Sequence, residues 1–129
     1  MRFASWRGLP GDRCGVTALE FAILLPFFAT LVLGMMQVSQ VLWTQMALQH
    51  AVEMAARCAS INAASCGNPA QTQAYAAGQV YGMTLPAGTF VASAAACGNQ
   101  VLASLPYTLD VPLVALPAMT LTARSCYPA

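Results

Sequence analysis

The 129-residue chain is long enough for one domain, and it is unusually poor in charge. Only 7% of its residues are charged and 58% are hydrophobic, a balance that is rare in soluble domains. The net charge of +1 comes with five scattered arginines and no basic cluster, which argues against a nucleic-acid-binding face. The composition favours association with a membrane.

Residues 1–15 are predicted to be a short cytoplasmic leader. Three arginines and one aspartate lie before a long apolar stretch, and few charges follow that stretch closely. By the positive-inside rule the N-terminus lies in the cytoplasm, and the body of the protein lies on the other side of the membrane. Cys14 precedes the apolar stretch, whereas a lipid-modified cysteine would follow one. We therefore interpret Cys14 as a reduced residue of the leader.

Residues 16–42 are predicted to form a transmembrane helix. No Asp, Glu, Lys or Arg occurs in residues 21–49. Together with its flanking residues, the apolar run 21–36 is long enough for a bilayer core of ~30 Å at ~1.5 Å per helical residue. The run is longer than the apolar part of a cleaved signal peptide, and no suitable cleavage site follows it. We predict a permanent membrane anchor.

Glu20 stands at the threshold of this apolar run. An ionisable group at the edge of a membrane helix is costly, so its presence is by default a hypothesis of function. The alternative is an ordinary interfacial acid whose carboxylate extends to the lipid headgroups.

The helix is predicted to continue past the membrane and to end near Asn62, before a cluster of helix breakers at residues 65–69. Four apolar residues share one side at helical spacing, namely Val41, Leu48, Val52 and Ala55. The other side carries His50, Glu53 and Arg57. Trp43 lies where an aromatic residue would mark the outer membrane interface.

Residues 43–129 are predicted to form an extracytoplasmic domain of α+β class. A second short helix is expected from Ala70 to about Met83. Strands are expected at residues 89–93, 100–110 and 119–126, with a turn at residues 97–99. Three prolines confine these strands to sheet edges or interruptions, namely Pro106, Pro112 and Pro117. We expect a small antiparallel β-sheet packed on the long N-terminal helix.

Four cysteines remain once Cys14 is assigned to the leader, namely Cys58, Cys66, Cys97 and Cys126. An even number outside the cytoplasm fits disulfides, and four cysteines allow three pairings. We favour Cys58–Cys66, which would join the end of the long helix to the following loop, and Cys97–Cys126, which would tie two strands. A zinc site is the alternative, but no C-x-x-C spacing occurs and the expected compartment is oxidising.

The sequence offers no catalytic constellation. Beyond the leader the acids are scattered, namely Glu20, Glu53 and Asp110, and the chain has one histidine and no lysine. No Gly-rich phosphate loop or Ser-His-Asp spacing is present. We therefore predict no enzyme activity, no catalytic residue, no metal site and no cofactor.

Two stretches of the chain carry a resemblance to a known family. Residues 15–26 read GVTALEFAILLP, and residues 42–51 read LWTQMALQHA. The chain resembles the TadE/TadG-like pseudopilins of the tight-adherence (Flp) pilus system, whose precursors are similar to type IV pilins. The likeness is looser at residues 116–124, which look like the family's closing strand. The resemblance implies that a prepilin peptidase cuts between Gly15 and Val16, before Glu20 and Phe21.

The spacing of these residues suits that chemistry. Gly15 has no Cβ, so its backbone can enter a protease cleft in extended form. Cleavage would free a positive amine at Val16, and the Glu20 carboxylate lies one helical turn further on. Pairing the two charges, within or between subunits, relieves part of the cost of holding each near hydrocarbon. Such pairing would favour staggered packing of helices in a filament.

Two functions of different class follow. The first is a minor pseudopilin of a tight-adherence pilus and secretion apparatus, contributing to pilus assembly and surface adhesion. Its implied partners are the prepilin peptidase, other pilins or pseudopilins, the inner-membrane assembly platform and membrane lipid. The second is a single-pass, membrane-anchored binding module that enters no filament. Either would lie in a bacterial inner membrane with its C-terminus in the periplasm, and the first also in the pilus. The sequence leaves open whether the subunit is a filament component or an assembly factor.

Overall fold

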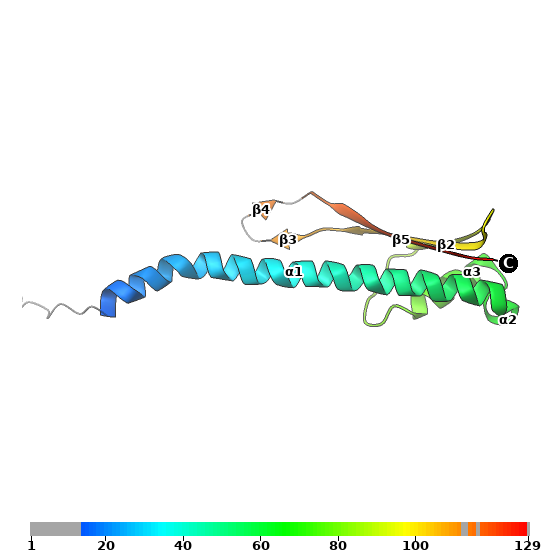
Figure 1. The fold of residues 1–129 in the computed structure, drawn as a ribbon, viewed down its shortest axis with the longest axis horizontal. Coiled ribbons are helices and arrows are strands. Elements are labelled where there is room, and N and C mark those ends of the chain that lie inside the picture. Colours follow the sequence, from blue (N-terminus) through cyan, green and yellow to red (C-terminus); the bar gives the residue numbers. More distant parts are fainter. Residues whose placement is uncertain (1–13, 112–113, 116, 129) are drawn as a thin grey trace, which may run out of the picture.

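A single long helix dominates the computed structural model, which describes residues 14–111, 114–115 and 117–128. Helix α1 spans Cys14–Ile61 and contains Pro26 without being ended by it. It stops before Asn62, whose side-chain oxygen accepts a hydrogen bond from the Ser65 backbone N–H at 3.2 Å and so caps the next helix. The predicted end of the long helix near Asn62 is confirmed (Figure 1). Of the predicted leader, only Cys14 and Gly15 lie within the described residues.

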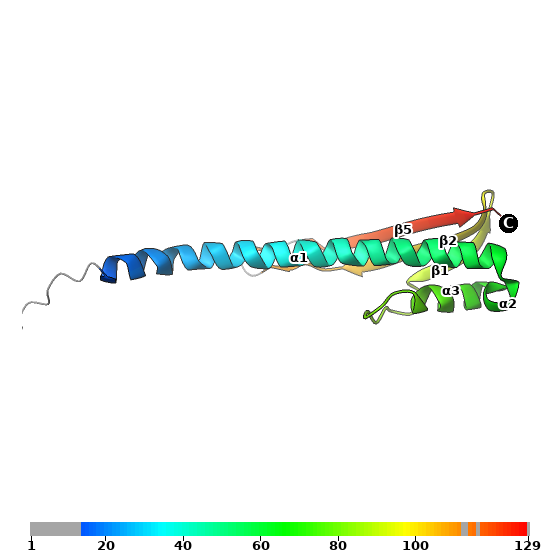
Figure 2. The same ribbon diagram turned by 60° about the horizontal axis from the view of Figure 1, so that its bottom comes forward.

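Two short helices turn the chain back along α1 (Figure 2). Helix α2 spans Ala63–Cys66, and helix α3 spans Pro69–Gly78. Asn68 caps α3 by accepting from the Gln71 N–H at 2.8 Å, and Pro69 occupies the first turn, where its missing N–H costs nothing. The predicted breaker cluster at residues 65–69 therefore contains the end of α2 and the start of α3 with its cap.

The prediction that the second helix runs to about Met83 is wrong, because α3 ends at Gly78. The chain then turns through Gly82, which has a φ of 75°. Leaving the helix early brings Val80 into the core at 5% exposure and lets Met83 and Leu85 pack against it. Burial of these apolar side chains outweighs continued helix propensity.

The sheet is antiparallel and has the strand order β1-β2-β5. Strand β1 spans Phe90–Ala95, β2 spans Gly98–Tyr107 and β5 spans Met119–Tyr127. The predicted α+β class is thus confirmed. Residues 96–97 form the turn between β1 and β2, and Gly98 pairs with Ala95 at a φ of 120° that favours glycine. The turn therefore begins one residue earlier than the predicted turn at residues 97–99 and ends two residues earlier, because β2 begins at Gly98.

The strand predicted over residues 100–110 is two strands in the structure. After β2 ends at Tyr107, a separate small hairpin pairs β3, Asp110–Val111, with β4, Val114–Ala115. Figure 1 shows this hairpin beside α1, on the N-terminal side of the main sheet, and β3 contacts α1. Pro112 lies outside the described residues, and Pro117 lies between β4 and β5.

Pro106 lies inside β2, the central strand, and the register explains why it is tolerated. The Ser104 N–H donates to the Thr89 carbonyl at 2.9 Å, on the β1 side. Backbone N–H groups alternate along a strand, so position 106 also faces that side. Because β1 pairs with β2 only as far as Ala103, Pro106 meets no partner strand there. Locally β2 is an edge, as the proline predicted.

The core lies between α1 and the sheet. The predicted apolar stripe of α1 is confirmed, since Leu48, Val52 and Ala55 are fully buried and Val41 packs against their cluster. The sheet contributes alternating inward residues, namely Val101, Ala103, Leu105, Leu121 and Ala123. The Gln45 side-chain amide donates to the Thr122 carbonyl at 2.8 Å and fixes α1 against β5. The structure is thus a helix-on-sheet layer, with α3 covering one flank (Figure 2).

Both favoured disulfides are confirmed. Cys58–Cys66 joins the end of α1 to α2, with 5.8 Å between the Cα atoms. Cys97–Cys126 joins the β1–β2 turn to β5, with 6.2 Å between the Cα atoms. These bonds consume the four thiols that the alternative zinc site required, so that alternative is wrong.

Candidate processing and assembly site on the membrane helix

Gly15 occupies the first turn of α1, where nothing in the fold requires a glycine. A Cβ built at this position meets no atom within 4 Å, and its φ does not lie in the left-handed region. Glycine in a helix nevertheless costs about 1 kcal/mol relative to alanine. The residue at this position therefore weakens the start of the helix without serving its packing.

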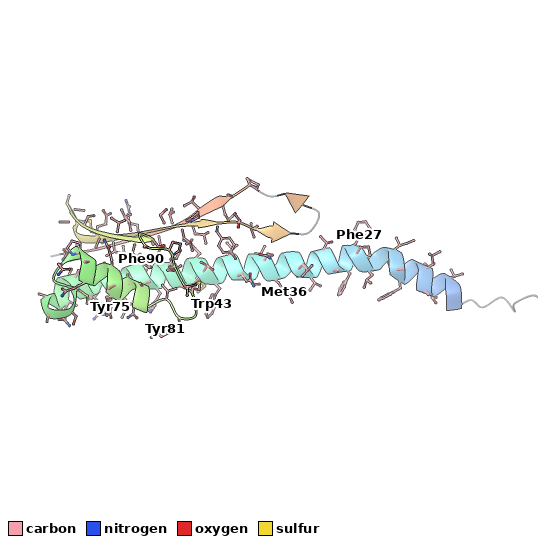
Figure 3. All side chains as sticks on the ribbon, turned by 180° about the vertical axis from the view of Figure 1, so that it is seen from behind. Phe27, Met36, Trp43, Tyr75, Tyr81 and Phe90 are labelled. Carbon is pink, nitrogen blue, oxygen red and sulfur yellow. A yellow bond between two sulfur atoms is a disulfide. The ribbon has the colours of Figure 1, made fainter. Side chains whose placement is uncertain are left out.

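Glu20 lies one turn after Val16 on the surface of α1. Glu20 is exposed, and the nearby Val16 and Phe21 are 60% and 66% exposed. No other Asp, Glu, Lys or Arg occurs between residues 15 and 52. The structure therefore presents one carboxyl group on an otherwise uncharged rod, and Figure 3 shows the side chains along this part of α1 projecting away from the helix on several sides.

The first half of α1 packs against no core of its own. Over residues 15–31 every residue except Thr30 is exposed, including Phe27 at 75%. Among the described residues, α1 is the one helix long and apolar enough to cross a membrane, and none of its most apolar stretch is buried. A core helix of a soluble protein would be covered, so this surface requires lipid or other helices.

The described residues contain no cluster of typical metal-ligating side chains. They contain no group of three or more His, Cys, Asp or Glu side chains close enough to share one. His50 is exposed on α1, on the side predicted to face away from the core. The predicted site residues separate into two regions: Gly15, Val16, Glu20 and Phe21 lie together at the start of α1, and the four bonded cysteines lie in the domain at its other end.

These features define a protein with a single-pass membrane anchor and a small α+β domain held by two disulfides. In a comparison with family models, residues 15–57 match the family described as TadE-like protein, which confirms the resemblance over this part of the chain. TadE-like proteins are pilus-related structural proteins, so the match links the long helix of this chain to the Tad pilus system. Comparison with curated proteins and with solved structures gave no match.

The matched segment has clear bounds on the structure. It begins at Gly15 and ends at Arg57, one residue before Cys58, so it follows α1 almost to its end. The disulfides and the whole sheet lie beyond it. The sequence did not predict one surface feature. Tyr81, which lies beyond the matched segment, is next to Trp43 on the surface of the folded chain. The one local signal for this position was Gly82, because a glycine next to an aromatic residue can mark a turn that exposes the ring.

Proposed function

We propose that the protein is a minor pseudopilin of a tight-adherence pilus, processed between Gly15 and Val16 by a prepilin peptidase. The observation that carries the proposal is the uncovered apolar rod with its single acid, at the residues where the TadE-like match begins. A filament made of such rods would cover the surface that the isolated chain leaves bare. The proposed arrangement is a leader at residues 1–15, a membrane helix at 16–42 and a periplasmic domain at 43–129.

The weak first turn of α1 supports the processing step. A protease must bind its substrate in extended form, so residues around Gly15 have to leave the helix before cleavage. A glycine there lowers the cost of unwinding and leaves the scissile carbonyl open. After cleavage, the Val16 amine and the Glu20 carboxylate would lie a turn apart, in the same or in neighbouring subunits. The prepilin peptidase, other pilins and the inner-membrane assembly platform are the proposed partners.

Cleavage is tested by co-expression with a prepilin peptidase, followed by gel electrophoresis and N-terminal sequencing of membrane and sheared surface fractions. We expect a shortened chain that begins at Val16. Gly15→Val should block the shift, because a branched side chain at the scissile residue obstructs the protease. Gly34→Val is the matched control, since position 34 is also open space on α1 and lies far from the scissile bond.

The alternative function is a membrane-anchored binding module that enters no filament. It predicts that the working protein keeps Met1 to Gly15 and that Gly15→Val changes nothing. Recovery of the uncut precursor as the only form in native membranes, with active peptidase present, would overturn the pseudopilin proposal.

A further inference from the structure

The connection between α3 and β1 brings Tyr81 to α1 beside Trp43. Helix α3 runs back along α1, so its last residues and the following loop lie on the side of the domain nearer the membrane helix (Figure 2). Trp43 and Tyr81 together line two adjoining shallow hollows on the surface. Figure 3 shows both aromatic residues on the same side of α1. Residues far apart in the sequence therefore form one aromatic surface.

The fold leaves these rings uncovered. Trp43 is 68% exposed and Tyr81 is 79% exposed, although Thr44 next to Trp43 is buried. Gly82, with its positive φ, makes the turn that carries Tyr81 outward. Met46, at 71% exposure, extends the surface along α1, and the half-buried Tyr107 borders it from the end of β2. Large aromatic side chains dominate the energetics of contact surfaces, so this exposure indicates a partner.

The height of this surface on α1 identifies the partner. The charge-free part of α1 runs from Phe21 to Val52, and its first stretch of about 20 residues after Glu20, Phe21 to Gln40, matches a hydrocarbon core of ~30 Å. Trp43 follows within one turn of its end, in the zone that headgroups occupy. Tyr81 lines the same hollow as Ser39 and Gln40, so the loop reaches that level too.

The chemistry of the surface agrees with that position. Neither hollow is lined by an Asp, Glu, Lys or Arg among the described residues. The next charged residue along α1 is Glu53, about 15 Å beyond Trp43 at ~1.5 Å per residue. Trp and Tyr are enriched where one end of a ring meets hydrocarbon and the other meets water.

We propose that Trp43 and Tyr81 form a lipid-contacting collar that lies in the headgroup region of a phospholipid bilayer. Trp43 contacts the headgroups from α1, and Tyr81 adds a second contact from the loop after α3. The two contacts together fix the height and tilt of the domain over the membrane. The proposal depends on the single-pass anchor and not on cleavage or filament assembly. It holds for either orientation of α1.

The test places a single tryptophan at position 81 of the full-length chain, as Tyr81→Trp with Trp6→Phe and Trp43→Phe. The protein is reconstituted at one copy per phosphatidylcholine nanodisc, with quencher-bearing lipids labelled at the headgroup or at increasing acyl depth. We expect the headgroup label to lower emission roughly twofold or more, as expected for an interfacial ring. Trp6→Phe alone, which keeps Trp43, is the positive reference.

Ile61→Trp in the same double background is the matched control. Ile61 is also well exposed, at 68%, but it lies at the far end of α1 and should not be quenched. Quenching of position 81 no stronger than that of position 61, in a variant with both disulfides formed and an unchanged melting curve, would overturn the collar. Protection of position 81 that appears only with several copies per nanodisc would assign the surface to a second copy of the chain instead, and would equally overturn it.

Discussion

Val16 and Glu20 lie four residues apart on a helix surface that carries no other Asp, Glu, Lys or Arg as far as Val52. At this spacing side chains on a helix are neighbours, and the amine of a chain beginning at Val16 would lie on the same face. A carboxylate in this setting is expensive to hold near hydrocarbon unless it is paired. Glu20 is therefore the residue at which assembly can be tested.

We expect Glu20→Gln to separate processing from assembly. The variant should still be cut after Gly15, but its amount in sheared surface material should fall roughly tenfold or more, because an unpaired amine in a low-dielectric interface costs several kcal/mol. Immunoblots of membrane and sheared fractions measure both steps.

Glu53→Gln is the control for this prediction. Glu53 is exposed on the domain, where its carboxylate accepts a hydrogen bond from the Gln49 amide at 3.0 Å, and a glutamine oxygen can replace that acceptor. Equal loss of both variants from the sheared fraction would show that the charge at residue 20 has no special role.

At the scale of elements, the two disulfides restrain different parts of the domain. Cys58–Cys66 has a sequence separation of 8 and holds the reversal from α1 into α2. Cys97–Cys126 has a separation of 29 and holds the β1–β2 turn to the last strand. In the chain-entropy model, a bond that closes a longer loop removes more freedom from the unfolded state. The strand-to-turn bond should therefore contribute more to stability.

Replacing each pair by alanine tests this difference. We expect the free energy of unfolding to fall by about 3.5 kcal/mol for Cys97→Ala with Cys126→Ala, and by about 2.5 kcal/mol for Cys58→Ala with Cys66→Ala. Denaturant titrations of the reconstituted chain, followed by tryptophan emission in a Trp6→Phe background, measure both. A larger loss at Cys58–Cys66 would point instead to packing around Cys66, which is 3% exposed.

As a whole, the molecule combines a bare apolar rod with a small domain at one end (Figure 1). The fully buried residues begin at Leu48, and the partly buried residues that pack against them begin at Val41. The main sheet, α2 and α3 all pack on this second half of α1, while the β3–β4 hairpin lies further toward the N-terminus. The domain's core therefore uses α1 only from Val41 onward.

A chain that starts at Gln40 should consequently fold without detergent. We expect both disulfides to form and thermal unfolding to be cooperative, as followed by circular dichroism. Leu48→Ala in this fragment should lower the melting temperature by roughly 10 °C or more, because it empties a fully buried site at a cost of about 2–5 kcal/mol. Met46→Ala is the matched control, since Met46 is 71% exposed. A fragment that shows no transition would mean that contacts with the first half of α1 hold the domain together.

The sequence by itself determined the features that depend on neighbours along the chain. The charge-free run, the helical spacing of Leu48 and Val52 and the breaker cluster specified α1 and its end near Asn62. The even cysteine count favoured disulfides, and the expected order of helix, loop and strands favoured the two pairings that the structure contains. Only the tertiary structure decided where α3 ends, because Val80 gains more by burial in the core than by continuing the helix. It alone divided the long predicted strand into β2 and β3. It also brought Tyr81 to Trp43, since contacts between distant segments depend on how the layers pack, which no local periodicity encodes.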